Sequence, residues 1–450
     1  MKKIVALICL NLSLLSIAQD HYSGISTSKR TGILNGTFNP AELASLNSKV
    51  EIHLFSLSTN VANNKLGFND LTSDTDLEEI LFTGSEPVNL RLDVEIFGPS
   101  LAFKYKKWGF GVSSKAFGKL NLVDIDVNIG DAISNNGINS IFNSTALIGN
   151  NNQRLNGTTY GELGLSVARN IWENEKYNFN AGATVKLLFP GSYANFGANQ
   201  LNGTVTTVAG NSFLTNTNAT LNIAYSGSLA NSFSDFEDYR NSVFGNLNGL
   251  GLDIGAQFTL KDTDKSKGYK INSGISVRNI GSMKFTDANN SSTDYSLVIQ
   301  GNESLNLSQF DDVESLQEIE QILLDSGFLT AVSSNRDFKV KLPTVINIYS
   351  DFRLVPSFYL SVFWQQKIND DNQNDQITAQ NTLTLTPRFS LKHFEVFSPW
   401  TQNEISGLNG GIGFRAGGFF VGSGSLITSL INDSKHADFY LGFRLGIGKS

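Results

Sequence analysis

The sequence has almost no cysteine, and this absence limits its chemistry. Cys9 is the single cysteine among 450 residues, and it lies within the apolar run Ile4–Ile17. A basic start precedes this run and the small residue Ala18 follows it, an order typical of a cleaved secretory signal peptide, which we assign to residues 1–19. The exported chain then contains no cysteine, so we expect neither disulfide bonds nor thiolate metal sites.

Charge, proline and histidine are also scarce. Charged residues make up 17% of the chain, which has 8 prolines and 4 histidines. No two histidines are close in sequence, so no pair of imidazole ligands is evident. The formal net charge of −7 argues against a nucleic-acid partner, which would require a basic surface. Beyond the signal peptide, no apolar run reaches the length of a membrane-spanning helix.

Catalytic motifs are missing as well. The nearest match to a G-x-S-x-G nucleophile elbow is Gly164–Ala168, which lies in a predicted strand without the strand-turn-helix context. HExxH, P-loop and EF-hand motifs do not occur. His393 follows a predicted turn, and no second partner for catalysis accompanies it. We therefore predict that the chain is not an enzyme and that it has no cofactor, no catalytic residues and no metal site.

Strict alternation of apolar and polar residues is the strongest positive pattern. In Val88–Phe97 the even-numbered residues are apolar and the odd-numbered ones up to Glu95 are polar or charged, so a β-strand would separate them onto opposite faces. A soluble β-sandwich would bury the apolar face. An outer-membrane barrel would instead turn it to lipid and the charged face to a wet lumen. The high content of glycine, 41 residues, and phenylalanine, 32 residues, accompanies this pattern.

The spacing of the alternating segments favours the barrel. Fourteen strands are expected near residues 48–60, 88–106, 109–122, 159–169, 177–189, 247–260, 269–280, 338–349, 356–367, 378–391, 393–398, 406–416, 418–427 and 438–448. The conspicuous long connections follow odd strands and the short ones follow even strands, as in a barrel with both termini in the periplasm. The predicted fold is an all-β, transmembrane, antiparallel up-and-down β-barrel of about 14 strands.

Three further segments with regular patterns lie in the long connections, outside the fourteen strands. Residues 218–225, NATLNIAY, resemble a strand, and admitting them alone would spoil the parity. Asp74–Phe82 and Asp311–Asp325 have helical patterns with polar starts and glycine after their ends. The second segment carries an apolar stripe, which favours packing over the barrel rim, although capping of the pore or contact with a partner is the alternative.

A short helix is expected just before the first strand. Asn39 suits the N-cap, Pro40 the first helical position, Ala41 the helix interior and Glu42 the third position after the cap. We interpret residues 20–47 as an N-terminal hatch or plug segment and residues 48–450 as the barrel. A capped turn that simply leads into the barrel is the alternative.

The second strand contains an interruption at Gly98-Pro99. The apolar residues are even-numbered before it and odd-numbered after it, a change of phase that a β-bulge produces. A bulge can curve the barrel wall, which is the interpretation we favour, or open the wall towards the membrane.

Charged residues of both signs fall on the polar faces. We expect six of them to face the lumen: Arg91, Asp93, Glu95, Asp253, Arg278 and Arg444. They can form ion pairs that fill the interior, or they can line a water-filled path. Mixed charge argues against a strongly ion-selective pore.

Several short motifs resemble a known family. They are Asn39-Pro40-Ala41, GLGLDIGAQF at Gly249–Phe258, INSGISVRNIG at Ile271–Gly281, LPT at Leu342–Thr344 and TPRF at Thr386–Phe389. They resemble the FadL-like (long-chain fatty-acid transporter) superfamily of outer-membrane barrels. The whole chain is more similar to the family catalogued as domain of unknown function 5723. The resemblance implies a fourteen-stranded barrel with an N-terminal plug, and it names no substrate.

These patterns leave three hypotheses for function. The first is a FadL-like passive channel in the outer membrane for a hydrophobic or small solute. The second is a barrel that does not transport and serves secretion or surface assembly as a scaffold, with its loops 190–246 and 281–337 binding secretion or surface proteins. The third is a secreted soluble β-protein, such as an adhesin, whose apolar faces meet in pairs. The expected partners are outer-membrane lipid and, for the channel, a hydrophobic small molecule.

Overall fold

The computed structural model describes residues 21–70, 77–134, 142–232, 244–262, 268–311 and 313–449. Within these ranges the chain forms a ring of 14 antiparallel strand positions, which closes where β1 pairs with β23. The closure runs from Ser48 opposite Lys449 to Ala62 opposite His436. The predicted all-β barrel of about 14 strands is therefore confirmed.

The ring contains both continuous strands and strands divided into two pieces. In ring order they are β1 (Ser48–Asn63), β2 (Val88–Phe97) with β3 (Ser100–Tyr105), β4 (Trp108–Ile125), β6 (Gln153–Glu173), β7 (Tyr177–Val208), β9 (Gly249–Lys261), β10 (Tyr269–Phe285), β14 (Phe338–Lys341) with β15 (Val345–Val355), β16 (Phe358–Lys367), β17 (Thr382–Ser390), β18 (Phe394–Phe397) with β19 (Trp400–Asn403), β20 (Gly407–Gly410) with β21 (Ile412–Ala416), β22 (Phe419–Ser423) and β23 (His436–Lys449).

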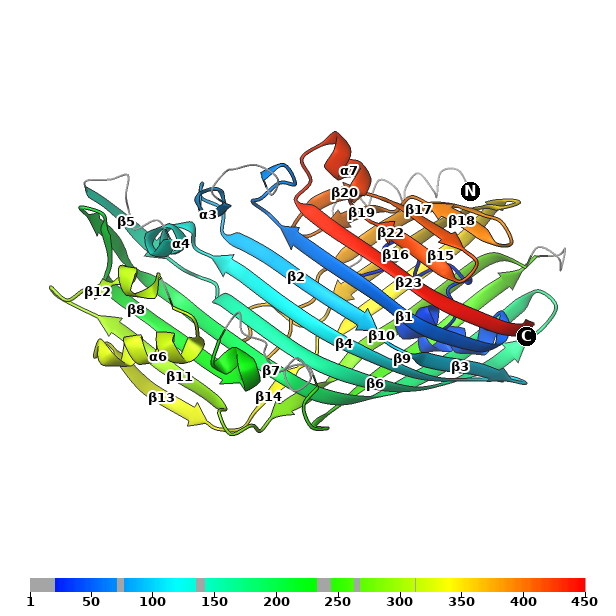
Figure 1. The fold of residues 1–450 in the computed structure, drawn as a ribbon, viewed down its shortest axis with the longest axis horizontal. Coiled ribbons are helices and arrows are strands. Elements are labelled where there is room, and N and C mark those ends of the chain that lie inside the picture. Colours follow the sequence, from blue (N-terminus) through cyan, green and yellow to red (C-terminus); the bar gives the residue numbers. More distant parts are fainter. Residues whose placement is uncertain are drawn as a thin grey trace.

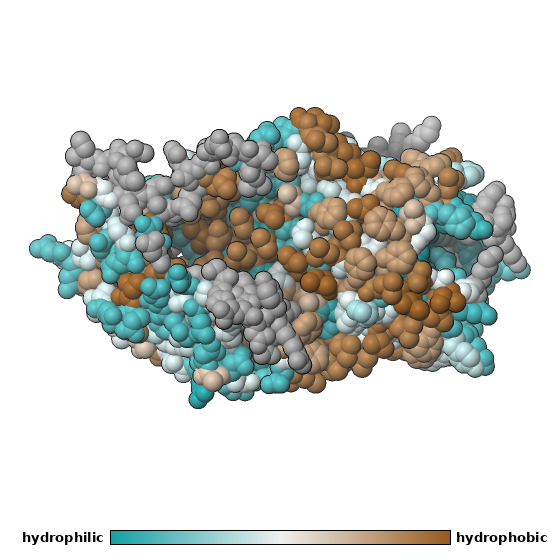
Figure 2. Space-filling model, viewed as in Figure 1, coloured by the Kyte–Doolittle hydropathy of each residue, from teal (hydrophilic) through white to brown (hydrophobic). Residues whose placement is uncertain are grey.

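The burial of the second strand shows which way its two faces point. Leu92 and Ile96 are 37% and 48% exposed, whereas Arg91, Asp93 and Glu95 are 2%, 4% and 5% exposed. The charged face is inside and the apolar face is outside, the reverse of a soluble β-sandwich. Figure 2 shows the resulting hydrophobic covering over the barrel wall, with hydrophilic residues gathered towards both ends.

The connections differ between the two ends of the barrel. Tight turns join β3 to β4 and β15 to β16, and the C-terminus lies at this same end, on the right of Figure 1. The long connections leave the other end, as the sequence predicted, although a tight turn at residues 404–406 joins β19 to β20 there. Below we call the end that holds the β3–β4 and β15–β16 turns the short-turn end.

The long connections contain more structure than the sequence predicted. The strand expected at 177–189 continues as β7 to Val208, and it pairs there with β5 (Phe142–Ile148) and β8 (Asn211–Ser226). β8 pairs in turn with β11 (Ser291–Ile299) and β12 (Leu305–Asn306), and β11 pairs with β13 (Leu329–Asn335). We call this sheet the extension; it lies to the left in Figure 1. The NATLNIAY segment is part of β8, outside the ring, so it does not disturb the parity.

The helices of the described residues are short. They are α2 (Ile33–Phe38), η2 (Pro40–Ser45), α3 (Leu77–Leu81), α4 (Val127–Ser134), η4 (Gly227–Ala230), η6 (Leu307–Phe310), α6 (Leu316–Asp325) and α7 (Leu426–Ile431). The helix predicted from Asp74 has its start outside the described residues. The helix predicted over Asp311–Asp325 begins only at Leu316. Among the described residues, no helix combines the length and apolar composition needed to cross a membrane.

Candidate functional site

The N-terminal segment lies inside the ring near the short-turn end. Tyr22, Ile25, Leu34 and Leu43 are 0–1% exposed and pack against inward-facing aromatic side chains of the wall. One such contact is that of Phe38 with Phe363, whose ring centroids are 6.2 Å apart. Figure 1 shows the two short helices of the segment within the barrel. Residues 21–46 therefore occupy the lumen at this level.

The predicted helix at Asn39 is present and is held by the wall. η2 starts at Pro40, and the Asn39 side chain accepts a hydrogen bond from the Ala41 amide at 3.0 Å. The Asn39 amide group also donates to the carbonyl oxygen of Ala256 at 2.8 Å. The Glu42 carboxylate accepts hydrogen bonds from Asn272 at 2.9 Å and from the Tyr349 hydroxyl at 2.5 Å. The turn that caps η2 is thus bonded to three wall strands, β9, β10 and β15.

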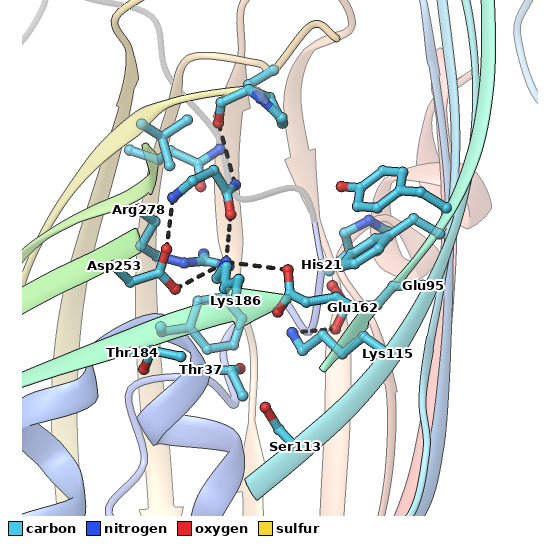
Figure 3. Close-up of a pocket in the computed structure, with 18 of the residues that line it drawn as sticks. His21, Thr37, Glu95, Ser113, Lys115, Glu162, Thr184, Lys186, Asp253 and Arg278 are labelled. Atoms are coloured by element: carbon cyan, nitrogen blue, oxygen red, sulfur yellow. Dashed lines mark hydrogen bonds and ion pairs between the residues drawn. The ribbon is translucent and has the colours of Figure 1, made fainter. Parts of the chain in front are cut away.

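A small polar cavity of about 70 Å³ lies beside this segment in the middle of the lumen. Lys186 is at its centre and contacts Asp253 at 2.9 Å and Glu162 at 3.3 Å, as Figure 3 shows. Lys115 pairs with Glu95 at 2.8 Å. These ion pairs are almost fully buried, where each charge needs a partner to offset its loss of hydration.

The six predicted lumen residues all lie on the inner side of the wall, but not in one place. Glu95, Asp253 and Arg278 line the central cavity, where the Arg278 guanidinium lies 5.1 Å from the centroid of the Phe38 ring. Asp93 pairs with Lys119 at 2.7 Å. Arg91 lies further from the short-turn end, and Arg444 pairs with Glu51 at 2.5 Å close to that end. The charges therefore form several separate pairs along the lumen.

Gly98 and Pro99 separate β2 from β3, and the wall stays closed around them. Both pieces pair with β1 on one side and with β4 on the other. The Gly98 amide donates to the Ser114 carbonyl oxygen at 2.8 Å. The Ser114 hydroxyl donates to the Pro99 carbonyl oxygen at 3.0 Å, and the Ser114 amide donates to Ser100 Oγ at 3.2 Å. Serine side chains thus replace ladder hydrogen bonds at the interruption.

An apolar pocket lies at the opposite end from the tight turns. It has a volume of about 360 Å³ and is lined almost entirely by carbon. Residues from the rim of the barrel, from the extension and from the helices contribute to it, among them Leu122, Phe196, Leu221, Ile319 and Leu323. Figure 2 shows a hydrophobic hollow in this region, partly behind grey atoms. A pocket of this kind can bind a molecule with a large apolar surface.

Sequence reasoning missed the apolar pocket and one buried arginine. The pocket combines residues from connections that were expected to be loops. Arg154, on β6, is fully buried and was placed in a loop by the predicted strand boundaries. One sequence feature indicated that a buried partner was needed. Residues 369–376, NDDNQNDQ, are all polar, so their side chains and carbonyl oxygens need many hydrogen-bond partners.

Among the described residues, no group of three or more histidine, cysteine, aspartate or glutamate side chains is arranged to hold a metal ion. The carboxylates in the lumen contact lysine or arginine instead.

A profile of the family described as "Family of unknown function (DUF5723)" matches residues 40–424. No curated protein matches the chain in sequence. Similar solved structures include a TodX monoaromatic hydrocarbon channel mutant, with 10% identity, 94% of this chain and 98% of that chain covered and a TM-score of 0.47. The toluene transporter TodX of P. putida has 8% identity, coverage of 93% and 95% and a TM-score of 0.45. A FadL homologue of Pseudomonas aeruginosa has 10% identity, coverage of 96% and 98% and a TM-score of 0.39.

Proposed function

We propose that the chain, which belongs to the family of unknown function DUF5723, is a passive outer-membrane channel for hydrophobic small solutes. The apolar pocket of about 360 Å³ is the observation that carries the proposal. Such a cavity lies at the lower end of the roughly 300–1,000 Å³ typical of small-molecule sites, and its lining offers little to a polar ligand.

The outer surface supports a place in the membrane. Exposed side chains on the wall include Leu101, Phe103, Val112 and Leu165, each between 42% and 45% exposed. Exposure of such a surface to water would cost free energy, whereas in a bilayer the surface faces the hydrocarbon region. With the barrel in an outer membrane, the short-turn end faces the periplasm and the extension faces outward. Export requires a leader, and the signal peptide predicted at residues 1–19 lies outside the described residues.

The N-terminal segment acts in this proposal as the hatch. In this proposal residues 20–47 are the hatch and residues 48–450 are the barrel, the division inferred from the sequence, and Asn39, Pro40, Ala41 and Glu42 anchor the hatch. Gly98 and Pro99 act as a curvature device, because the wall around them is closed by serine hydrogen bonds. The solute meets the apolar pocket first and the hatch last.

The test is uptake of the apolar dye N-phenyl-1-naphthylamine by vesicles whose outer leaflet is lipopolysaccharide, with purified protein inserted. We expect faster uptake than in protein-free vesicles, and we expect Ile319→Gln to reduce both dye binding and uptake several-fold because Ile319 lines the pocket. The matched control is Val332→Gln, a 69% exposed residue of the same extension that does not line the pocket. An intact barrel that neither binds nor admits the dye would contradict the channel and favour the scaffold hypothesis.

A further inference from the structure

The segment between β16 and β17, residues 368–381, crosses the interior of the barrel. β16 is the ninth of the fourteen ring positions and β2 is the second, so they lie on opposite sides. Asp371 nevertheless forms an ion pair with Arg91 of β2 at 3.1 Å. The backbone of the same segment contacts Arg154 of β6. We call residues 368–381 the crossing loop.

Arg154 holds the backbone of the crossing loop in one conformation. Its guanidinium donates hydrogen bonds to the carbonyl oxygens of Asp371 at 2.8 Å and Gln376 at 3.0 Å. It also donates to the side-chain oxygen of Asn195 on β7 at 3.1 Å. Among the described residues, no carboxylate lies within ion-pair distance of Arg154. The buried charge is therefore solvated by the Asn195 side chain and by backbone carbonyl groups that only the folded loop supplies.

Further bonds hold the loop to the same side of the barrel. The Asn152 amide group donates to the Asn372 carbonyl oxygen at 2.9 Å and to the Asn374 side chain at 2.7 Å. The Tyr193 hydroxyl donates to the Asn374 carbonyl oxygen at 2.7 Å. Near the start of the loop, Lys367 pairs with Asp371 at 2.6 Å. The loop is thus fixed at its origin and at its far side.

The crossing loop separates two cavities. Its residues Thr378 and Ala379 line the central polar cavity described above. Its residues Asp370, Asp371 and Asn372 line a second cavity of about 310 Å³, nearer the extension. The same short segment therefore forms part of the wall of each cavity.

We propose that the crossing loop is the selectivity barrier of the lumen, and that Arg154 is the positioning residue that keeps it closed to hydrophilic solutes. The proposal rests on the proposed channel function, because it concerns passage through a barrel that spans a membrane. A sugar could pass only by displacing the loop, several of whose polar groups already have partners on the wall. Release of Arg154 removes several of these bonds at once.

The experiment measures swelling of proteoliposomes in L-arabinose. Unmodified protein should give no swelling above that of protein-free vesicles, and Arg154→Ala should give several-fold faster swelling. The matched control is Arg336→Ala, an exposed arginine whose contact is one hydrogen bond to the Ala288 carbonyl oxygen. Each variant is first shown to be a folded barrel by its gel mobility before and after boiling.

Two further variants keep the test decisive if Arg154→Ala does not fold. Asp371→Asn removes the ion pair across the lumen and should give a smaller gain in arabinose permeability. A short bifunctional thiol reagent that joins cysteines introduced at Asn152 and Asn374 should suppress swelling in the Asp371→Asn background. The proposal is overturned if folded Asp371→Asn remains impermeable, or if unmodified protein already admits arabinose. Dye uptake is measured separately, so failure of the channel function is distinguishable.

Discussion

Glycine residues of the wall make room for the N-terminal segment. A Cβ added to Gly182 on β7 would lie 2.6 Å from the carbonyl carbon of Pro40, and one added to Gly255 on β9 would lie 2.1 Å from Asn39 Oδ1. One added to Gly109 on β4 would lie 2.1 Å from the Leu43 carbonyl oxygen. Glycine within a strand often marks close approach of another backbone, and here that backbone is the proposed hatch.

We predict that Gly182→Ala loosens the N-terminal segment. The added methyl group would clash with backbone atoms of the segment, which cannot move aside by a change of rotamer. This overpacking should weaken the docking of the hatch by about 1–3 kcal/mol. Hydrogen exchange followed by mass spectrometry should show several-fold faster exchange over residues 33–45, with little change in the wall.

Gly118→Ala is the matched control for that prediction. Gly118 is on β4, and no atom lies within 4 Å of the position of an added Cβ. Exchange over residues 33–45 should therefore match that of the unmodified protein. Equal exchange in both variants would contradict the close fit at Gly182.

For single residues, the sequence predicted hydrogen bonds to near neighbours in the chain, but it did not predict the partners that lie far away in sequence. The cap at Asn39 and the start of the helix at Pro40 follow from rules that act within four residues, and both are confirmed. The bond from Asn39 to Ala256 spans 217 positions, and no local pattern encodes it. The role of Arg154 was missed for the same reason, since its partners lie more than 200 residues away on the crossing loop.

Among the helices, α6 shows how a prediction from N-cap preferences can place the start of a helix wrongly. Ser308 suits an N-cap, and the sequence predicted a helix from Asp311. In the structure Asn306 caps the short η6 helix instead, and Ser315 caps α6 by accepting a hydrogen bond from the Glu318 amide at 3.2 Å. Two competing caps are close together, and packing of Leu316 against the extension favours the later one.

Ring strands were predicted far better than those of the extension. Ring strands alternate strictly because one face meets an apolar surrounding and the other a polar lumen. β8 and β11 instead bury a face against α4 and α6, and their sequences mix threonine, asparagine and serine with the apolar residues. Such segments resemble loops when they are considered without their partners.

We predict a defined pH dependence for the docking of α6. Glu320 of α6 accepts hydrogen bonds from the hydroxyls of Tyr225 at 2.8 Å and Tyr295 at 2.5 Å. Burial and the Glu320 carboxylate raise the pKa of Tyr225 to about 12, and they also raise the pKa of Tyr295. Because the folded state favours the neutral phenols, this contribution is complete below the ordinary tyrosine pKa of about 10 and is lost as the pH rises through about 12.

Binding of N-phenyl-1-naphthylamine reports that transition, since Ile319 and Leu323 of α6 line the apolar pocket. Binding should stay constant from neutral pH to about 10 and then fall. In Glu320→Gln the carboxylate no longer opposes ionisation of the tyrosines, so the fall should occur at lower pH. Glu303→Gln, which changes an exposed carboxylate of the same region, should leave the profile unchanged. A profile independent of Glu320 would refute this coupling.

The hatch, the two cavities, the crossing loop and the apolar pocket follow one another along the barrel axis. The proposed hatch occupies the short-turn end, the central cavity with its ion pairs comes next, the crossing loop follows, and the apolar pocket lies at the extension. The ring and its strand count could be predicted from sequence because alternation repeats in every strand. The order of environments could not, because each combines residues from connections hundreds of positions apart.

Closure of the ring leads to a prediction about the intact protein. The pairing of β1 with β23 leaves the wall without a free edge, so loss of the barrel requires that many strand pairs separate together. We expect the protein to need detergent for extraction, and we expect unboiled samples to migrate differently from boiled ones on a denaturing gel. Removal of residues 436–450 deletes β23 and should abolish the difference, because β1 and β22 would then have unpaired edges. Full-length protein that is soluble without detergent and shows no change on boiling would contradict the membrane barrel, since its exposed leucines and phenylalanines would then have to be covered by another protein surface.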